Sequence, residues 1–205
     1  MSYSNLWVID KNFNGEGKDE FPNSWSLSPV VWDILLEKYL PDQDSKTRGY
    51  KRHYIPASMM DNTLFSRLNN LINGSEDQVD RVLWEFTNQQ VFDIKDKEFV
   101  SDCVKYFLER NKVLSFDVID KVQYRFNEVA KSILFLDREE YIYFIWKGSS
   151  CDDSVESWFK SYDEESEENK SKPLNMSTDL LCEFVVIKDN RVVDFVSNLD
   201  FFKDK

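Results

Sequence analysis

Residues 181–196 read LCEFVVIKDNRVVDFV, and this stretch decides the fold class. Two runs rich in β-branched residues flank Asp189 and Asn190, which are among the few residue types besides glycine that adopt positive φ. A two-residue turn of this kind joins the strands of a β-hairpin. The C-terminal part of the chain is therefore predicted to contain an antiparallel sheet.

Other segments extend this prediction toward the N-terminus. Residues 133–147, ILFLDREEYIYFIWK, place two β-rich runs around a short polar connection, which favours a second hairpin, with a continued helix as the alternative. The apolar run at 6–9 predicts a buried strand. The following segment 12–24 contains two glycines and a proline, and it therefore predicts a loop.

The N-terminal half has the periodicity of helices. Apolar residues recur at helical spacing after Ser28, which we predict as an N-cap followed by Pro29 at the first helical position. Further helices are predicted from 61 or 62 to 72, after a Ser75 cap, at about 97–110 and at about 116–130. We expect one α+β domain over residues 1–205, with a helical N-terminal half packed on a small antiparallel sheet built mainly from C-terminal hairpins.

The composition predicts a soluble cytoplasmic protein. The chain has 205 residues, of which 41% are hydrophobic and 15% aromatic, so it can bury one sizeable core. No run approaches the roughly 20 apolar residues that span a membrane, and no secretory signal is evident. Cys103, Cys151 and Cys182 form no CxxC pair, which favours reduced structural thiols.

The most acidic segment is 152–168, DDSVESWFKSYDEESEE, which holds eight carboxylates and one lysine of a chain with net charge −12. Its first part, about 152–162, predicts an amphipathic helix, because apolar residues fall on one face. The part at about 163–172 lacks apolar residues and predicts a mobile acidic loop.

We predict a partner-binding site where these two parts meet. Aromatic side chains would anchor a basic partner there, and carboxylates would attract it. A solubilising loop after a helix with core aromatics is the competing interpretation. The predicted residues are Trp158, Phe159, Tyr162, Asp163, Glu164, Glu165, Glu167 and Glu168.

A basic segment at 45–54, SKTRGYKRHY, gives an alternative site. Cations interleaved with tyrosines are typical of phosphate or nucleic-acid binding, although a solvated loop that balances nearby acids has the same composition. The alternative ligand-binding residues are Arg48, Lys51, Arg52 and His53.

No motif points to a catalytic centre, a metal or a cofactor. The chain has no HExxH, no calcium-loop pattern and no phosphate-binding glycine loop. His53 is the only histidine, and no nucleophile and base arrangement surrounds it. We therefore predict no catalytic residues, no metal site and no cofactor.

These observations favour an acidic protein-binding inhibitor over an enzyme. Such a protein, of the immunity type or the phage counter-defence type, would block a basic partner by steric and electrostatic occlusion. The net charge disfavours nucleic acids and membranes, and 26 Lys and Arg disfavour a DNA mimic. The alternative is an enzyme or binding protein for a phosphorylated or nucleotide ligand that uses the basic segment.

Overall fold

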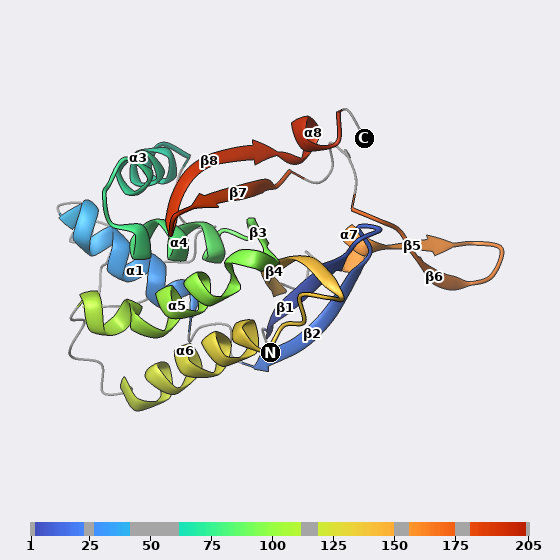
Figure 1. The fold of residues 1–205 in the computed structure, drawn as a ribbon, viewed down its shortest axis with the longest axis horizontal. Helices are drawn as coiled ribbons and strands as arrows, with labels where there is room; N and C mark the ends of the chain where they lie inside the picture. Colours follow the sequence, from blue (N-terminus) through green and yellow to red (C-terminus); the bar gives the residue numbers. More distant parts are fainter. Residues whose placement is uncertain are drawn as a thin grey trace.

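The centre of the fold is a mixed sheet of six strands in the order β2-β1-β4-β3-β7-β8 (Figure 1). The computed structural model describes residues 3–22, 27–41, 62–111, 119–149, 156–174 and 181–203. The strands are β1 (Tyr3–Asp10), β2 (Gly15–Pro22), β3 (Val91–Asp93), β4 (Tyr141–Ser149), β7 (Glu183–Lys188) and β8 (Arg191–Ser197). Neighbours are antiparallel except β3 and β7, which are parallel. The α+β class is confirmed, with a sheet that is larger than predicted and not purely antiparallel.

Among the described residues, five longer helices lie together beside this sheet (Figure 1). They are α1 (Ser28–Tyr39), α3 (Asn62–Asn73), α4 (Gln78–Thr87), α5 (Lys97–Asn111) and α6 (Ile119–Leu134). A 3-10 turn, η3 (Ile94–Asp96), connects β3 to α5. Two short helices, α7 (Glu156–Phe159) and α8 (Asn198–Phe201), come later in the chain. The expectation of a helical N-terminal half is therefore confirmed.

Strand alternation divides the buried side chains into two cores. Leu6 and Val8 of β1 belong to the first core, whereas Trp7 and Ile9 belong to the second. Successive strand residues point to opposite faces of a sheet, so the two cores lie on opposite faces. β1 is consequently buried on both faces, which suits the apolar run at 6–9.

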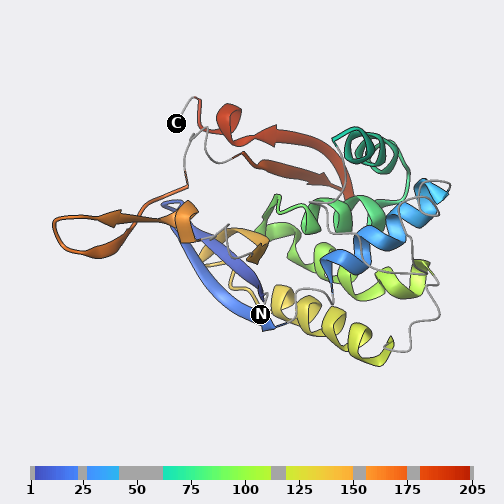
Figure 2. The ribbon, with the colours of Figure 1, turned by 180° about the vertical axis from the view of Figure 1, so that it is seen from behind.

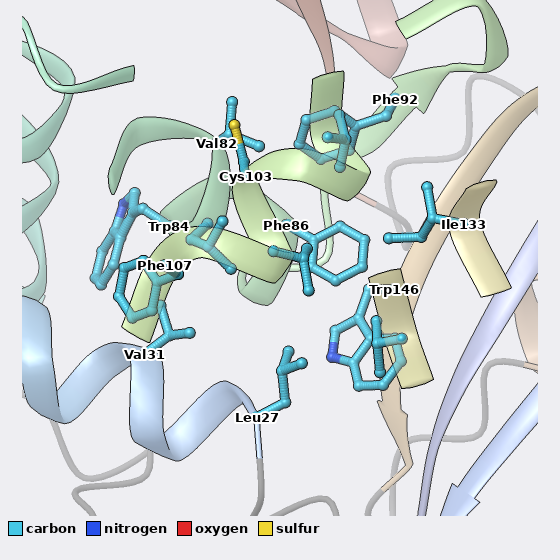
Figure 3. Close-up of a cluster of buried hydrophobic side chains, with 14 of the residues drawn as sticks. Leu27, Val31, Val82, Trp84, Phe86, Phe92, Cys103, Phe107, Ile133 and Trp146 are labelled. Atoms are coloured by element: carbon cyan, nitrogen blue, oxygen red, sulfur yellow. The ribbon is translucent and has the colours of Figure 1, made fainter. Parts of the chain in front are cut away.

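The first core fills the space between the sheet and the long helices. Figure 3 shows Trp84 and Phe86 of α4 and Trp146 of β4 among its members. Phe86 stacks on Trp146 with 5.5 Å between ring centroids, and Phe86 also meets Phe92 edge to face at 6.0 Å. Aromatic pairs at such distances contribute beyond the area they bury. These contacts attach α4 to the centre of the sheet.

A buried carboxylate ties three helices together at the edge of this core. Asp80 of α4 has a fully buried side chain. Lys38 Nζ lies 2.5 Å from Asp80 Oδ2, and Tyr39 OH donates to the same oxygen at 2.8 Å. Asn111 of α5 donates to Asp80 Oδ1 at 3.1 Å. Lys38 also pairs with Asp77 at 3.1 Å, so α1, α4 and α5 share one ion-pair and hydrogen-bond network.

The second core is smaller and mostly aromatic. Phe184 of β7 stacks on Phe201 of α8 with centroids 4.0 Å apart, and Tyr143 meets Phe184 edge to face at 5.0 Å. Trp7 and Ile145 extend this core along the sheet. Its outer cover comes from α7, α8 and Leu174.

The hairpin that decides the fold class is confirmed. β7 and β8 pair with Lys188 opposite Arg191, and the two turn residues Asp189 and Asn190 have φ of 50° and 57°. Positive φ at both central positions is characteristic of a type I′ turn, whose twist matches the twist of the two strands it joins.

The loop prediction at 15–22 is wrong, and at residues 133 and 134 the helical alternative is the one observed. Residues 15–22, predicted as a loop, form the edge strand β2, whose only buried residue is Phe21. β2 is an edge strand whose side chains are mostly exposed, so it needs few apolar residues. Its sequence therefore lacks the apolar alternation that would predict a strand. Residues 133 and 134 continue α6, as the alternative allowed, because Val129 and Ile133 bury one helical stripe. β4 accordingly pairs with β1 and β3.

Two predicted helix caps are also corrected. Leu27 occupies the N-cap of α1 without a side-chain hydrogen bond, and Ser28 Oγ instead accepts from Trp146 Nε1 at 3.0 Å. The N-cap of α4 is Asp77, which accepts from Asp80 N. Ser75 Oγ accepts from Asp77 N at 3.2 Å, so it orders the turn before the cap.

Within the described ranges, no helix combines the length and the apolar character needed to cross a bilayer.

Candidate protein-binding site

Residues 160–171, which begin in the acidic segment, form an arm that extends away from the six-stranded sheet (Figures 1 and 2). Strands β5 (Lys160–Asp163) and β6 (Glu168–Ser171) pair as a separate antiparallel sheet, with Tyr162 opposite Asn169. We call β5, β6 and their turn at 164–167 the acidic arm. The amphipathic helix predicted to residue 162 ends at Phe159, and the residues predicted as a loop form a turn and a strand.

The arm is rooted in the second core by Phe159. Its side chain is 1% exposed, and its ring stacks on Trp7 with centroids 5.2 Å apart and planes 14° apart. Gly15 of β2 lies directly beneath, because a Cβ added there would be 2.3 Å from Phe159 Cγ. The absence of a side chain at Gly15 is therefore what allows this ring to reach the sheet.

The return end of the arm is fixed by backbone hydrogen bonds. Lys172 N donates to Phe159 O at 2.7 Å, which closes the base of the hairpin. Leu174 N donates to Phe13 O at 2.8 Å, and the Leu174 side chain is buried in the second core. Both ends of the arm are thus attached to the β1-β2 side of the molecule.

The turn at the tip is ordered by Asp163. Its Oδ1 accepts from Glu165 N at 2.9 Å and from Ser166 N at 3.2 Å, the pattern by which an Asp side chain stabilises a turn. Lys170 forms an ion pair with the other carboxylate oxygen of Asp163. Glu167 has φ of 54°, a conformation that is uncommon outside glycine. The tip therefore has a defined shape although it contains neither glycine nor proline.

The exposed surface of the arm is acidic, with one aromatic ring. Tyr162 is 62% exposed. Directly opposed residues of an antiparallel pair share a face, so Tyr162 lies on one face of the arm, whereas Asp163 and its partner Glu168 lie on the other. The exposed carboxylates are Glu164, Glu165, Glu167 and Glu168.

The structure divides the predicted partner-binding residues into two groups. Phe159 is a core residue and is not accessible to a partner, and Trp158 is half-buried, with Lys147 Nζ 4.1 Å from its ring centroid. The prediction of an anchor at these two positions is therefore wrong for Phe159. Tyr162 and the carboxylates of the turn are exposed together on the arm.

The alternative ligand-binding residues Arg48, Lys51, Arg52 and His53 lie outside the described residues. Cys151 lies outside them as well. The basic segment therefore stays a prediction from the sequence.

The described cysteines are free and buried, and they do not form a reactive centre. Burial raises the pKa of Cys182 to about 12 and also raises the pKa of the Cys103 thiol. A thiol held protonated is a poor nucleophile and a poor metal ligand. Within the ranges that the structure describes, no three His, Cys, Asp or Glu residues are grouped as a metal would require.

A shallow groove of about 620 Å³ runs along α5. Its lining includes Phe99, Cys103 and Tyr106, which recur at helical spacing, together with Asp102, Glu109 and Arg110. Acidic and basic groups are mixed there, and no polar side chains converge on a common point. The groove offers apolar contact area but no arrangement suited to chemistry.

Sequence reasoning missed the residues that shape the acidic arm. Lys170 holds Asp163, and Gly15 admits Phe159. One local signal was present. Lys160 and Tyr162 are two residues apart, as on one face of a strand, and Asp163, a common turn initiator, follows them. The contact with Gly15 has no local signal, because the two residues are distant in sequence.

Comparison of the chain with protein-family models, with curated proteins and with solved structures finds no match in any of the three.

Proposed function

We propose that the protein is an acidic protein-binding inhibitor, of the immunity or phage counter-defence type, that inserts the acidic arm into a basic site of another protein. The observation that carries this proposal is the projection of the arm from the rest of the molecule, with exposed carboxylates at its tip (Figure 2).

The fixed attachment of the arm to the second core and its ordered turn support a binding role. A flexible acidic loop loses conformational freedom when it binds, and this loss weakens the complex. Phe159 is stacked on Trp7, and Asp163 orders the turn. The backbone of the arm therefore has a defined conformation before a partner binds. Binding then loses less conformational entropy, which favours a tighter complex.

The charge of the arm supports the choice of a basic partner. Residues 160–171 hold five carboxylates against two lysines, and Lys170 is engaged by Asp163. Carboxylates concentrated at a protruding tip steer a cationic surface toward it and raise the association rate at low salt. Tyr162 adds an aromatic side chain of the type that dominates binding energies at interfaces.

Occlusion is the mechanism that follows from this shape. A two-stranded arm is narrow enough to enter a cleft that a sheet or a helix bundle cannot enter. Once inside, the Glu164 and Glu165 carboxylates occupy the positions of an anionic ligand, and the body of the protein blocks access. Inhibition would then require no chemistry from the inhibitor itself.

The test is an affinity capture from the native cell with three baits. The baits are the unchanged protein, the arm variant Glu164→Lys/Glu165→Lys, and a matched control, Glu139→Lys/Glu140→Lys. The control places the same charge change in another exposed turn. We expect a basic protein that is captured by the unchanged bait and by the control but lost from the arm variant.

The captured protein is then purified and its affinity measured by calorimetry at several salt concentrations. We expect the affinity to fall by at least tenfold in the arm variant and to weaken with rising salt, and the activity of the partner to be inhibited at a 1:1 ratio. A partner that binds the arm variant as tightly as the unchanged protein, or no partner at all, would contradict the proposal.

A further inference from the structure

Glu85 of α4 is a buried carboxyl group that has no role in the acidic arm. Glu85 is 3% exposed, and Asn73 Nδ2 of α3 donates a hydrogen bond to Glu85 Oε1 at 2.7 Å. A carboxylate removed from water and met by a neutral amide lacks the compensation that buried charges usually have. The protonated, neutral form suits this position better.

The amide that meets Glu85 has an unused acceptor. Asn73 Oδ1 is buried and has no hydrogen-bond partner among the residues that the structure describes. Its Nδ2 also donates to Asn69 Oδ1 at 3.2 Å, and Trp84 Nε1 donates to that same oxygen at 2.8 Å. A neutral carboxyl that accepts from Asn73 Nδ2 and donates to Asn73 Oδ1 makes the paired hydrogen bonds of an acid and amide dimer. Protonation of Glu85 would therefore satisfy a buried oxygen that otherwise stays unpaired.

The charged groups that act on Glu85 come from α4 and β7. Burial is the largest influence and raises the pKa of Glu85 to about 7, against the hydrogen bond from Asn73, which lowers it. Glu183 of β7 raises the pKa further, and Arg81 of α4 lowers it. From α3 only the neutral Asn73 acts on the carboxyl.

We propose that Glu85 is a proton-dependent latch: in its protonated form it holds α3 on α4 through Asn73, and loss of the proton weakens this attachment. The latch is a regulatory feature of the helical layer and does not depend on the proposed function of the arm.

The direction of the pH effect follows from linkage. The ordinary pKa of a glutamate is 4.5, and burial raises the pKa of Glu85 to about 7 while α3 is docked. Opening of α3 would admit water to the carboxyl and return its pKa toward the ordinary value. The docked form therefore binds more protons between these values, and the attachment is strongest below pH 4.5. Opening therefore increases with pH, by at most about tenfold per pH unit for this one group, up to about pH 7 and is constant above it.

Hydrogen exchange of the amides in residues 62–73 tests this latch. Exchange is measured by mass spectrometry at pH 5, 6 and 7, with labelling times scaled to the intrinsic exchange rates. The variants are Glu85→Gln, a neutral group of the same shape, and Glu109→Gln, an exposed control on α5. We expect the opening of α3 to rise with pH, by at most about tenfold per pH unit, in the unchanged protein and in the control, and to be independent of pH in Glu85→Gln.

A carboxyl titration followed by NMR gives a second readout without a substitution at Glu85. We expect a midpoint within about one unit of 7 for the unchanged protein, and a lower midpoint in Glu183→Gln, because the nearby negative charge is removed. A Glu85 midpoint below 5 would overturn the proposal. The same would follow from a pH slope in the Glu85→Gln exchange data that equals the slope of the unchanged protein.

Discussion

The ring of Phe159 lies over the indole of Trp7, with 5.2 Å between the ring centroids and 14° between the planes. Trp7 belongs to β1, an inner strand of the six-stranded sheet, and Phe159 is the last residue before β5. The contact therefore sets where the acidic arm leaves the molecule. It also explains why an aromatic residue inside an acidic segment is buried.

The close approach of Gly15 to Phe159 gives a sharp prediction. In Gly15→Ala the new Cβ would lie 2.3 Å from Phe159 Cγ, so the ring must leave its site. We expect a loss of about 1–3 kcal/mol in the free energy of unfolding, measured by urea denaturation. The matched control is Gly17→Ala, where the nearest atom, on Trp7, is 3.6 Å away, and a change within about 0.5 kcal/mol is expected. Equal stabilities of the two variants would refute the contact.

The pairing of Lys38 with Asp80 predicts a large effect of losing the cation. Lys38→Met leaves a carboxylate whose side chain is fully buried without its ionic partner. We expect a destabilisation of about 3–5 kcal/mol, measured by chemical denaturation. Lys95→Met removes the cation of an exposed pair with Asp93 and should change stability by less than about 1 kcal/mol. A Lys38 variant as stable as the Lys95 variant would contradict a stabilising role for this ion pair.

The raised pKa of Asp96, the last residue of η3, predicts that the stability of the protein depends on pH. Burial raises the pKa of its carboxyl to about 6, and Lys95, which lowers it, only partly opposes this. The folded protein thus binds more protons than the unfolded chain between the ordinary pKa of 3.8 and about 6, and stability falls as the pH rises through this window. Asp96→Asn should reduce this fall, as measured by thermal unfolding at pH 4, 5, 6 and 7. An unchanged pH profile would contradict the raised pKa.

The turn between β7 and β8 predicts a backbone effect. Asn190 has φ of 57°, which a β-branched side chain adopts only with strain. Asn190→Val should destabilise the protein by about 1–3 kcal/mol. Asn190→Gly serves as the control and should be neutral or slightly stabilising, because glycine adopts this φ without strain. Thermal unfolding of both variants distinguishes this result from a simple loss of the Asn side chain.

The parts of the fold that the sequence predicted are those with strong local signals. The hairpin at 181–196 combines β-branched runs with a turn that permits positive φ, and α3 and α5 have clear apolar periodicity. These signals depend on residues close in the chain. For this reason their elements agree with the structure to within a few residues.

The remaining elements depend on contacts between distant residues. β2 is a strand because it pairs with β1, although its own residues are mostly polar. Residues 160–163 are a strand because β6 pairs with them, and Phe159 is buried because Gly15 and Trp7 accept its ring. The sequence alone singled out the acidic segment, but which of its aromatics faces outward required the tertiary structure.

The parallel pairing of β3 with β7 has a consequence for synthesis of the chain. Val91 and Phe92 lie opposite Phe184 and Val185, so this side of β3 stays unpaired until residues 183–188 have left the ribosome. Until then the nascent protein presents an open apolar strand edge, which is a template for aggregation. A chain interrupted before Glu183 should therefore depend on chaperones to stay dispersed, and the final hairpin is the segment that ends this dependence.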